Sequence, residues 1–163
     1  MNFNAREIFD IGVQIEVNGK AFYEAAAKKT AETATREFFL ELAAWEGTHI
    51  TLFNELRDAL PKGAGNVPLF DPNDEAALYL QATADSHVFV KNRDMVALVA
   101  GCKSPLDMLD IAMTFEKDSV VFYTTMKKVV AKNLGQDKVD RLIDEEIKHI
   151  SLLSQRKAKI AKR

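Results

Sequence analysis

Apolar residues recur at spacings of three and four along most of the chain, which is the period of an amphipathic helix. In the first such stretch, the residues that keep to one face are Ile8, Ile11, Ile15, Phe22 and Ala26. Three later stretches show the same period, and no stretch of any length alternates as a half-buried strand does. The pattern predicts four long helices, over residues 5–30, 35–60, 105–132 and 137–159.

The ends of these helices are marked by a few glycines, prolines and capping residues. Pro61 and Gly63 follow the second helix and stop it. Asn4 precedes the first helix and Ser104 precedes the third. Both side chains can accept hydrogen bonds from the free N–H groups of a first turn. Residues 61–104 therefore form a crossover between the second and third helices.

The crossover has weaker helical patterns of its own, and we expect short helices over residues 73–84 and 94–100. A chain of 163 residues is one domain's worth of protein and can bury a substantial core. We predict a single all-α domain over residues 1–163. It is a four-helix bundle built from two helical hairpins, 5–60 and 105–160, joined by the long crossover.

Composition and charge exclude several classes of protein. The chain has 22 basic and 24 acidic residues, and a net charge of −2 gives no reason to expect a nucleic-acid partner. The longest apolar stretch, residues 96–102, is too short to cross a membrane, and the N-terminus lacks the pattern of a secretory signal. We therefore expect a cytoplasmic protein. A single cysteine, Cys102, excludes a disulfide framework and an iron–sulfur cluster held by this chain alone.

The chain also repeats itself with a period of one hundred residues. The repeated pairs include Ile11 and Ile111, Glu16 and Glu116, Tyr23 and Tyr123, Leu42 and Leu142, Glu46 and Glu146, and His49 and His149. The first hairpin thus looks like a copy of the second.

Each copy carries the same set of metal-binding side chains. A lone glutamate in the middle of one helix, Glu16 or Glu116, is followed thirty residues later by a Glu-x-x-His pair. Residues three apart lie on one helix face, so both members of a pair can bind the same ion or adjacent ions. The pairs are Glu46 with His49, and Glu146 with His149. The alternative is that these are solvated glutamates with incidental histidines.

The charges of this set suit two divalent cations. Four carboxylates carry −4, which two such ions would balance, whereas four bare carboxylates in a bundle core would repel one another. Oxygen-rich ligands with one imidazole for each metal favour iron or manganese, and zinc can substitute. A Glu from each of two helices and Glu-x-x-His from the other two is the ligand set of di-iron carboxylate bundles.

These residues and their spacing resemble the ferritin-like di-iron superfamily and, within it, the rubrerythrin group. The resemblance implies two iron ions, bridged by Glu46 and Glu146 and further held by Glu16, Glu116, His49 and His149. It also implies that Tyr23 and Tyr123 donate hydrogen bonds that orient the carboxylates. The implied activity is the reduction of peroxide or dioxygen, with a role in oxidative stress. The alternative is an iron-binding or iron-handling protein without turnover.

The chain departs from rubrerythrins in two places. Rubrerythrins usually have a C-terminal rubredoxin domain with four cysteines, so here we expect a separate electron donor, such as a rubredoxin-type protein. They also have a further glutamate three residues after the ligand of the third helix. Here that position is Ser119, and its repeat partner is Gly19. This makes the site similar to the six-ligand site of bacterioferritins and oxidases. Related bundles often pair, and we expect a homodimer.

Two residues are direct neighbours of predicted ligands, and the direction of their side chains is considered separately. Trp45 and Glu145 each come directly before the glutamate of a Glu-x-x-His pair. Successive residues of a helix point about 100° apart, so we expect both side chains to face away from the site. Trp45 would then pack in the core, with an electron path as a weaker alternative, and Glu145 would point away from the site. His87, which has no Glu three residues before it, is expected to be structural or solvated.

Overall fold

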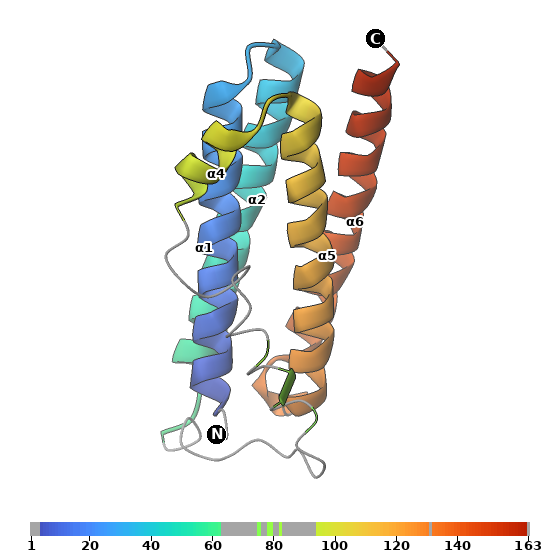
Figure 1. Ribbon diagram of the computed structural model, residues 1–163. Helices are drawn as coiled ribbons and strands as arrows, with labels where there is room; N and C mark the ends of the chain where they lie inside the picture. Colours follow the sequence, from blue (N-terminus) through green and yellow to red (C-terminus); the bar gives the residue numbers. More distant parts are fainter. Residues whose placement is uncertain are drawn as a thin grey trace.

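The computed structural model describes residues 4–62, 75, 78, 79, 82, 94–130 and 132–162. Four long helices form the body of the molecule (Figure 1). They are α1 (Ala5–Lys29), α2 (Thr33–Asp58), α5 (Pro105–Val129) and α6 (Gln136–Ala161). The short helix α4 (Met95–Gly101) precedes α5, and a 3₁₀ turn, η2 (Lys132–Leu134), joins α5 to α6. The predicted all-α bundle is confirmed.

The direction of the helices explains why a long crossover is needed. In Figure 1, α1 and α6 run upwards and α2 and α5 run downwards. The end of α2 and the start of α5 therefore lie at opposite ends of the bundle, and the connection has to travel its full length. α4 lies across α1 close to the start of α5.

The predicted caps are present at the starts of α1 and α5. The Asn4 side chain accepts a hydrogen bond from the Glu7 N–H (3.0 Å), and the Glu7 carboxylate accepts one from the Asn4 N–H (2.9 Å). Ser104 and Asp107 form the same reciprocal pair at the start of α5. Such pairs satisfy N–H groups that have no partner within the helix, so they define where each helix begins.

α5 ends three residues earlier than predicted, at Val129 instead of residue 132. The last carbonyl groups of a helix need donors from elsewhere. Here the Gln136 side chain donates to the carbonyl of Lys127 (2.6 Å), and the backbone turns at Val130 into an extended conformation. α6 then begins after Gly135, whose φ of 94° lies in the left-handed region that favours glycine.

In the crossover, only the second of the two predicted short helices can be compared fully. α4 begins after Asp94, which caps it by accepting from the Ala97 N–H (3.0 Å). The Lys29 ammonium donates to the carbonyls of Val99, Ala100 and Cys102 at its other end, where a cation is favoured. The helix predicted over residues 73–84 lies largely outside the described residues, as does His87. The four residues described in that range are helical.

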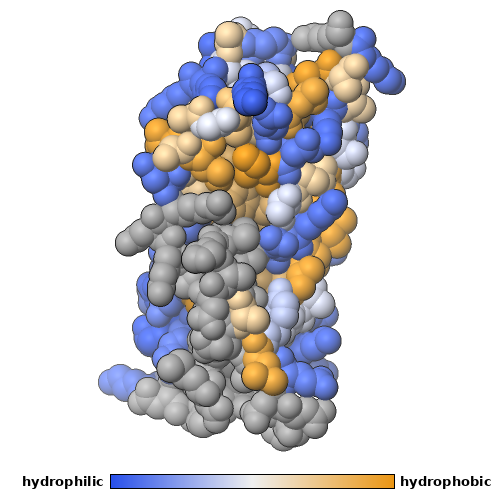
Figure 2. Space-filling model, viewed as in Figure 1, coloured by the Kyte–Doolittle hydropathy of each residue, from blue (hydrophilic) through white to orange (hydrophobic). Residues whose placement is uncertain are grey.

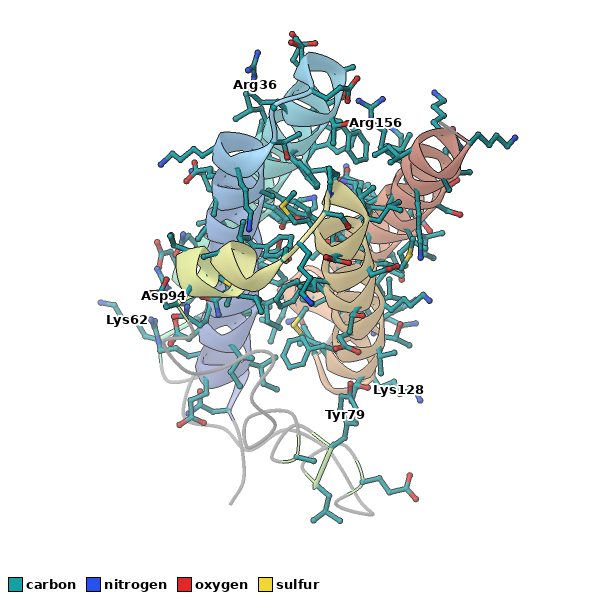
Figure 3. The ribbon with its side chains drawn as sticks, turned by 45° about the horizontal axis from the view of Figure 1, so that its top comes forward. Arg36, Lys62, Tyr79, Asp94, Lys128 and Arg156 are labelled. Carbon is teal, nitrogen blue, oxygen red and sulfur yellow. The ribbon has the colours of Figure 1, made fainter. Side chains whose placement is uncertain are left out.

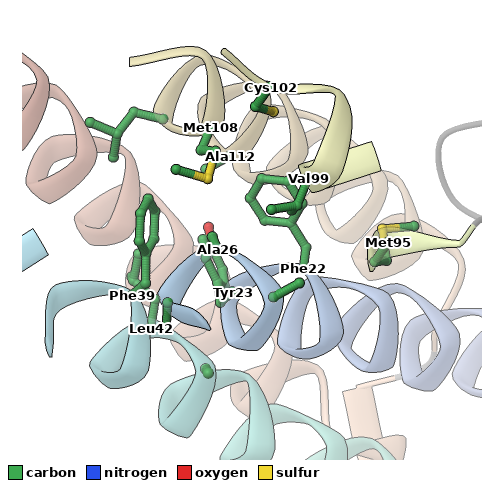
Figure 4. Packing of buried hydrophobic residues seen from close by; sticks show 14 of the residues in the cluster. Phe22, Tyr23, Ala26, Phe39, Leu42, Met95, Val99, Cys102, Met108 and Ala112 are labelled. Carbon is green, nitrogen blue, oxygen red and sulfur yellow. The ribbon is translucent and has the colours of Figure 1, made fainter. Parts of the chain in front are cut away.

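The core consists of two apolar clusters at different levels of the bundle. One contains Phe9 and Phe53 and lies toward the start of α1. The other contains Phe22, Phe39 and Met108, shown in Figure 4, and lies toward the end of α1. Side chains fill the space between the four helices (Figure 3). The six predicted metal ligands lie between the two clusters, so apolar side chains enclose them above and below.

Candidate metal centre

The bundle brings all six predicted ligands together at its centre. Each is at most 4% exposed. They come from all four long helices, α1, α2, α5 and α6, and they are Glu16, Glu46, His49, Glu116, Glu146 and His149. Buried charged groups are rare unless they are paired or bind a metal. These glutamates are therefore buried, not solvated as the alternative supposes.

The six residues form two overlapping groups, each able to offer four ligand atoms that lie within 4.8 Å of one another. One group has Glu16 and His49, and the other has Glu116 and His149. Both groups also contain Glu46 and Glu146. A carboxylate that belongs to two adjacent groups can bridge two ions, which is the arrangement that the spacing of the sequence indicates.

Two buried tyrosines hold the outer carboxylates, and they do so across the two hairpins. The Tyr123 hydroxyl of α5 donates to Glu16 of α1, and the Tyr23 hydroxyl of α1 donates to Glu116 of α5. Burial, followed by the charge of the nearby carboxylates, raises the pKa of both tyrosines well above the ordinary value. Both hydroxyls therefore keep their protons and remain donors.

The histidines face the carboxylates with the nitrogen Nδ1. In His49, Nδ1 lies 3.3 Å from an oxygen of Glu16 and 3.1 Å from one of Glu146. Burial by itself lowers the pKa of His49, but these contacts outweigh it and raise the pKa to about 11. In the same way, contacts with Glu116 and Glu146 overcome burial and raise the pKa of His149 to about 9. Without metal, protons on the two rings supply positive charge at neutral pH.

The two shared carboxylates also take up protons when no metal is present. Burial, followed by the charges of Glu16 and Glu116, raises the pKa of Glu146 to about 8. Burial and then the charge of Glu16 raise the pKa of Glu46 well above its ordinary value. The centre thus balances part of its negative charge with protons, and metal ions would replace them.

One buried atom indicates that the protein groups alone do not complete this centre. The oxygen Oε1 of Glu146 has no hydrogen-bond partner among the residues that the structure describes. It lies 3.1 Å from Nδ1 of His49, but without the alignment of a hydrogen bond. An unpartnered buried carboxylate oxygen is costly, and a bound cation would satisfy it. The donor set, four carboxylates and two imidazoles, fits iron or manganese.

This chain lacks the further glutamate of rubrerythrins, and the two positions concerned, Ser119 and its repeat partner Gly19, are tightly packed. A Cβ atom on Gly19 would lie 3.2 Å from the carboxylate carbon of Glu46. Gly19 therefore makes room for Glu46, and a larger side chain there would displace that carboxylate. Its repeat partner Ser119 is also buried.

Two residues beside the centre were missed as parts of it. Glu145 was expected to face away, which is wrong: one of its carboxylate oxygens lies 2.8 Å from Nε2 of His49. Trp45 packs against the apolar cluster that contains Phe22, as predicted. It also stacks on the ring of His149, with ring centroids 4.8 Å apart and an interplanar angle of 6°. α2 and α6 pack against each other. A side chain that turns away from its own helix's ligands can therefore reach the histidine of the other helix.

A pocket of about 320 Å³ between α2 and α6 leads from the surface to this side of the centre. Its inner wall includes His49, and Glu145 lies beside it. The residues that line it are Thr48, His49, Leu52, Glu55, Lys138, Arg141, Leu142 and Glu145. A small molecule in this pocket would meet His49 and Glu145.

A four-helix bundle with paired Glu-x-x-His motifs and two further glutamates at its centre defines the class of ferritin-like di-iron carboxylate proteins. The chain belongs to the rubrerythrin family, whose family model matches residues 7–157. Its fold is similar to a crystal structure from Thermotoga maritima that is described as a ferritin-like diiron-carboxylate protein. The TM-score is 0.69, with 21% sequence identity over 97% of each chain. No curated protein matches the sequence closely enough to be compared.

No helix among the described residues is both long enough and apolar enough to cross a membrane.

Proposed function

We propose that this protein is a di-iron oxidoreductase that reduces peroxide or dioxygen with electrons from a separate donor. The observation that carries the proposal is the pair of overlapping ligand groups, which share Glu46 and Glu146 in a buried centre. Membership in the rubrerythrin family supports iron as the metal. When bound, two ferrous ions would supply the two electrons that convert peroxide to water.

The residues of the chain would prepare the centre for this reaction. Glu46 and Glu146 would hold the two ions close together, with Glu16, Glu116, His49 and His149 completing the two sides. Tyr123 and Tyr23 fix Glu16 and Glu116, so these carboxylates keep one orientation. The apolar clusters above and below exclude water, and the pocket between α2 and α6 admits the oxidant.

The electron donor is proposed to be a separate molecule. The chain has one cysteine, which cannot form the four-cysteine iron site of a rubredoxin domain. A rubredoxin-type protein is the donor that the family resemblance indicates.

The test is repeated turnover. The protein is loaded with ferrous iron without oxygen and mixed with hydrogen peroxide or dioxygen, and oxidation is followed by stopped-flow absorbance. Ascorbate is then supplied and the cycle is repeated. We expect peroxide or dioxygen to be consumed over many cycles, faster than by the same concentration of free iron.

The matched variants are Glu46→Gln and Glu41→Gln. Both remove one carboxylate from α2, but Glu46 belongs to both ligand groups, whereas Glu41 is exposed. We expect Glu46→Gln to lose iron and turnover, and Glu41→Gln to keep both. If Glu46→Gln keeps its full iron content, the ligand assignment is wrong.

A second candidate function is iron binding without turnover. It is favoured by the lack of the further carboxylate that rubrerythrins have. In this chain Ser119 stands at that position, and Gly19 stands at the equivalent position of the repeat. The same experiment separates the two functions. An iron-handling protein would bind and oxidise ferrous iron once but would not cycle with ascorbate.

A further inference from the structure

The two histidines of the centre have different outer partners, although the rest of the centre is nearly symmetric. Trp45 and Glu145 occupy equivalent positions of the repeat, each directly before a shared glutamate. Each side chain reaches across to the histidine of the other hairpin. Glu145 contacts His49, and Trp45 stacks on His149. The repeat thus places a carboxylate behind one histidine and an indole behind the other.

The contact of Glu145 is directional. Its oxygen lies 2.8 Å from Nε2 of His49, while Nδ1 of the same ring points to the buried carboxylates. A carboxylate acceptor on Nε2 keeps a proton on that nitrogen. It thereby leaves the lone pair of Nδ1 for a metal ion and makes the ring a better ligand. It also fixes the rotation of the ring.

The contact of Trp45 has a different effect. An indole offers a hydrogen-bond donor and an apolar face but no acceptor. Its ring lies parallel to that of His149, so it limits the tilt of the imidazole without selecting which nitrogen carries the proton. The Lys148 ammonium lies on the indole, 5.2 Å from the centre of its ring.

We propose that Glu145 is a positioning residue that makes the two metal positions unequal, with tighter binding at the position that contains His49. The inference rests on the proposed di-metal function. Because Glu145 is 57% exposed, at the mouth of the pocket between α2 and α6, it can be replaced without opening the core.

The experiment measures zinc affinity at one position at a time, by competition with a coloured chelator. His149→Ala leaves the ligands of the metal position that contains His49 intact, and His49→Ala leaves the ligands of the position that contains His149 intact. Glu145→Ala is then added to each of these two variants. We expect Glu145→Ala to weaken zinc binding about 10- to 100-fold in the His149→Ala protein, as for other outer partners of ligating histidines. We expect no change in the His49→Ala protein.

Two further variants separate positioning from general charge. Asp144→Asn removes one negative charge at the neighbouring exposed residue of α6 and should leave zinc affinity unchanged. Glu145→Gln keeps an acceptor oxygen and should recover part of the affinity lost in Glu145→Ala. If a single-histidine variant unfolds, as checked by circular dichroism, glutamine replaces alanine at that position.

The rate at which the Nε2 proton of His49 exchanges with water is the readout that a merely structural role would not move. In zinc-loaded His149→Ala protein with ¹⁵N-labelled histidine, we expect the NMR spectra to show the proton of His49 on Nε2. In Glu145→Ala we expect that proton to exchange faster with water, because its acceptor is gone.

The outcomes are distinguishable. Equal losses in both single-histidine proteins, or none in either, would overturn the role of Glu145 and leave the metal centre intact. If the parent protein binds no zinc or iron at all, the proposed function and this inference fail together.

Discussion

At the scale of single residues, the centre depends on hydrogen bonds that cross between the two hairpins. Tyr123 belongs to the second hairpin and holds Glu16 of the first, while Tyr23 holds Glu116 in the opposite sense. Each hydroxyl is buried, and its partner is a carboxylate. Such charge-assisted hydrogen bonds are stronger than those between neutral groups, so the loss of one hydroxyl should be measurable.

We expect Tyr123→Phe to weaken iron binding about 10- to 100-fold, because Glu16 loses the donor that orients it. The free energy of unfolding should fall by about 1–3 kcal/mol, the usual cost when a buried polar group loses its partner. Iron titration and urea denaturation check the two effects. Tyr79→Phe, in the crossover, is the control and should leave iron affinity unchanged. Wild-type iron affinity in Tyr123→Phe would contradict this role.

At the scale of helical elements, close packing of α1 against α2 depends on a glycine. A Cβ on Gly12 would lie 2.9 Å from the ring of Phe53, which is completely buried. α2 has a glycine of its own, Gly47, but there the nearest atom to a new Cβ is the flexible end of Lys20, at 3.9 Å. The two positions share a helical backbone and differ in the space around them.

Alanine substitutions should therefore have opposite effects at the two glycines. In a helix, alanine is favoured over glycine by roughly 0.5–1 kcal/mol. We expect Gly47→Ala to raise the free energy of unfolding by that amount. We expect Gly12→Ala to lower the free energy of unfolding by about 1–3 kcal/mol, because the Phe53 ring has no room to move and this cost exceeds the helical preference for alanine. Urea denaturation measures both. Equal stabilisation by the two substitutions would show that Phe53 can repack.

At the scale of the whole molecule, α1, α2, α5 and α6 meet at a cluster of charges whose protons depend on folding. Folding raises the pKa of His49 from 6.5 to about 11, that of His149 from 6.5 to about 9, and that of Glu146 from 4.5 to about 8. In each case the folded state binds its proton more tightly than the unfolded state does. These three groups therefore stabilise the metal-free protein at low pH and lose that contribution as pH rises.

We expect the melting temperature of the metal-free protein to fall between pH 6 and pH 9. Metal binding needs the same groups without protons, so the gain in melting temperature on adding zinc should increase over that range. Circular dichroism at constant ionic strength measures both. In metal-free Glu146→Gln protein, the melting temperature should fall less steeply with pH below about pH 8. A metal-free protein that becomes more stable toward pH 9 would refute this account of its charges.

Much of the local structure could be predicted because it depends on residues close together in the chain. The period of apolar residues indicates helices, and the caps at Asn4 and Ser104 need only residues three positions away. The six polar residues of the centre could be found because the repeat gives each one a counterpart, and a spacing of three places Glu and His on one helix face.

Contacts between helices could not be predicted from spacing alone. Helical geometry turns Glu145 about 100° from its neighbour Glu146, and only the packing of α6 against α2 brings it to His49. Tyr23 follows Glu16 by seven residues, yet it contacts Glu116, because α1 and α5 lie side by side in opposite directions.

Local patterns in the chain are thus enough to define the helices, their caps and the residues that could bind metal. Which hairpin supplies the partner of each residue depends on how the helices pack. The physical reason is that helical period and capping act within a few residues, whereas the partner of a side chain depends on which helices pack together and in which direction.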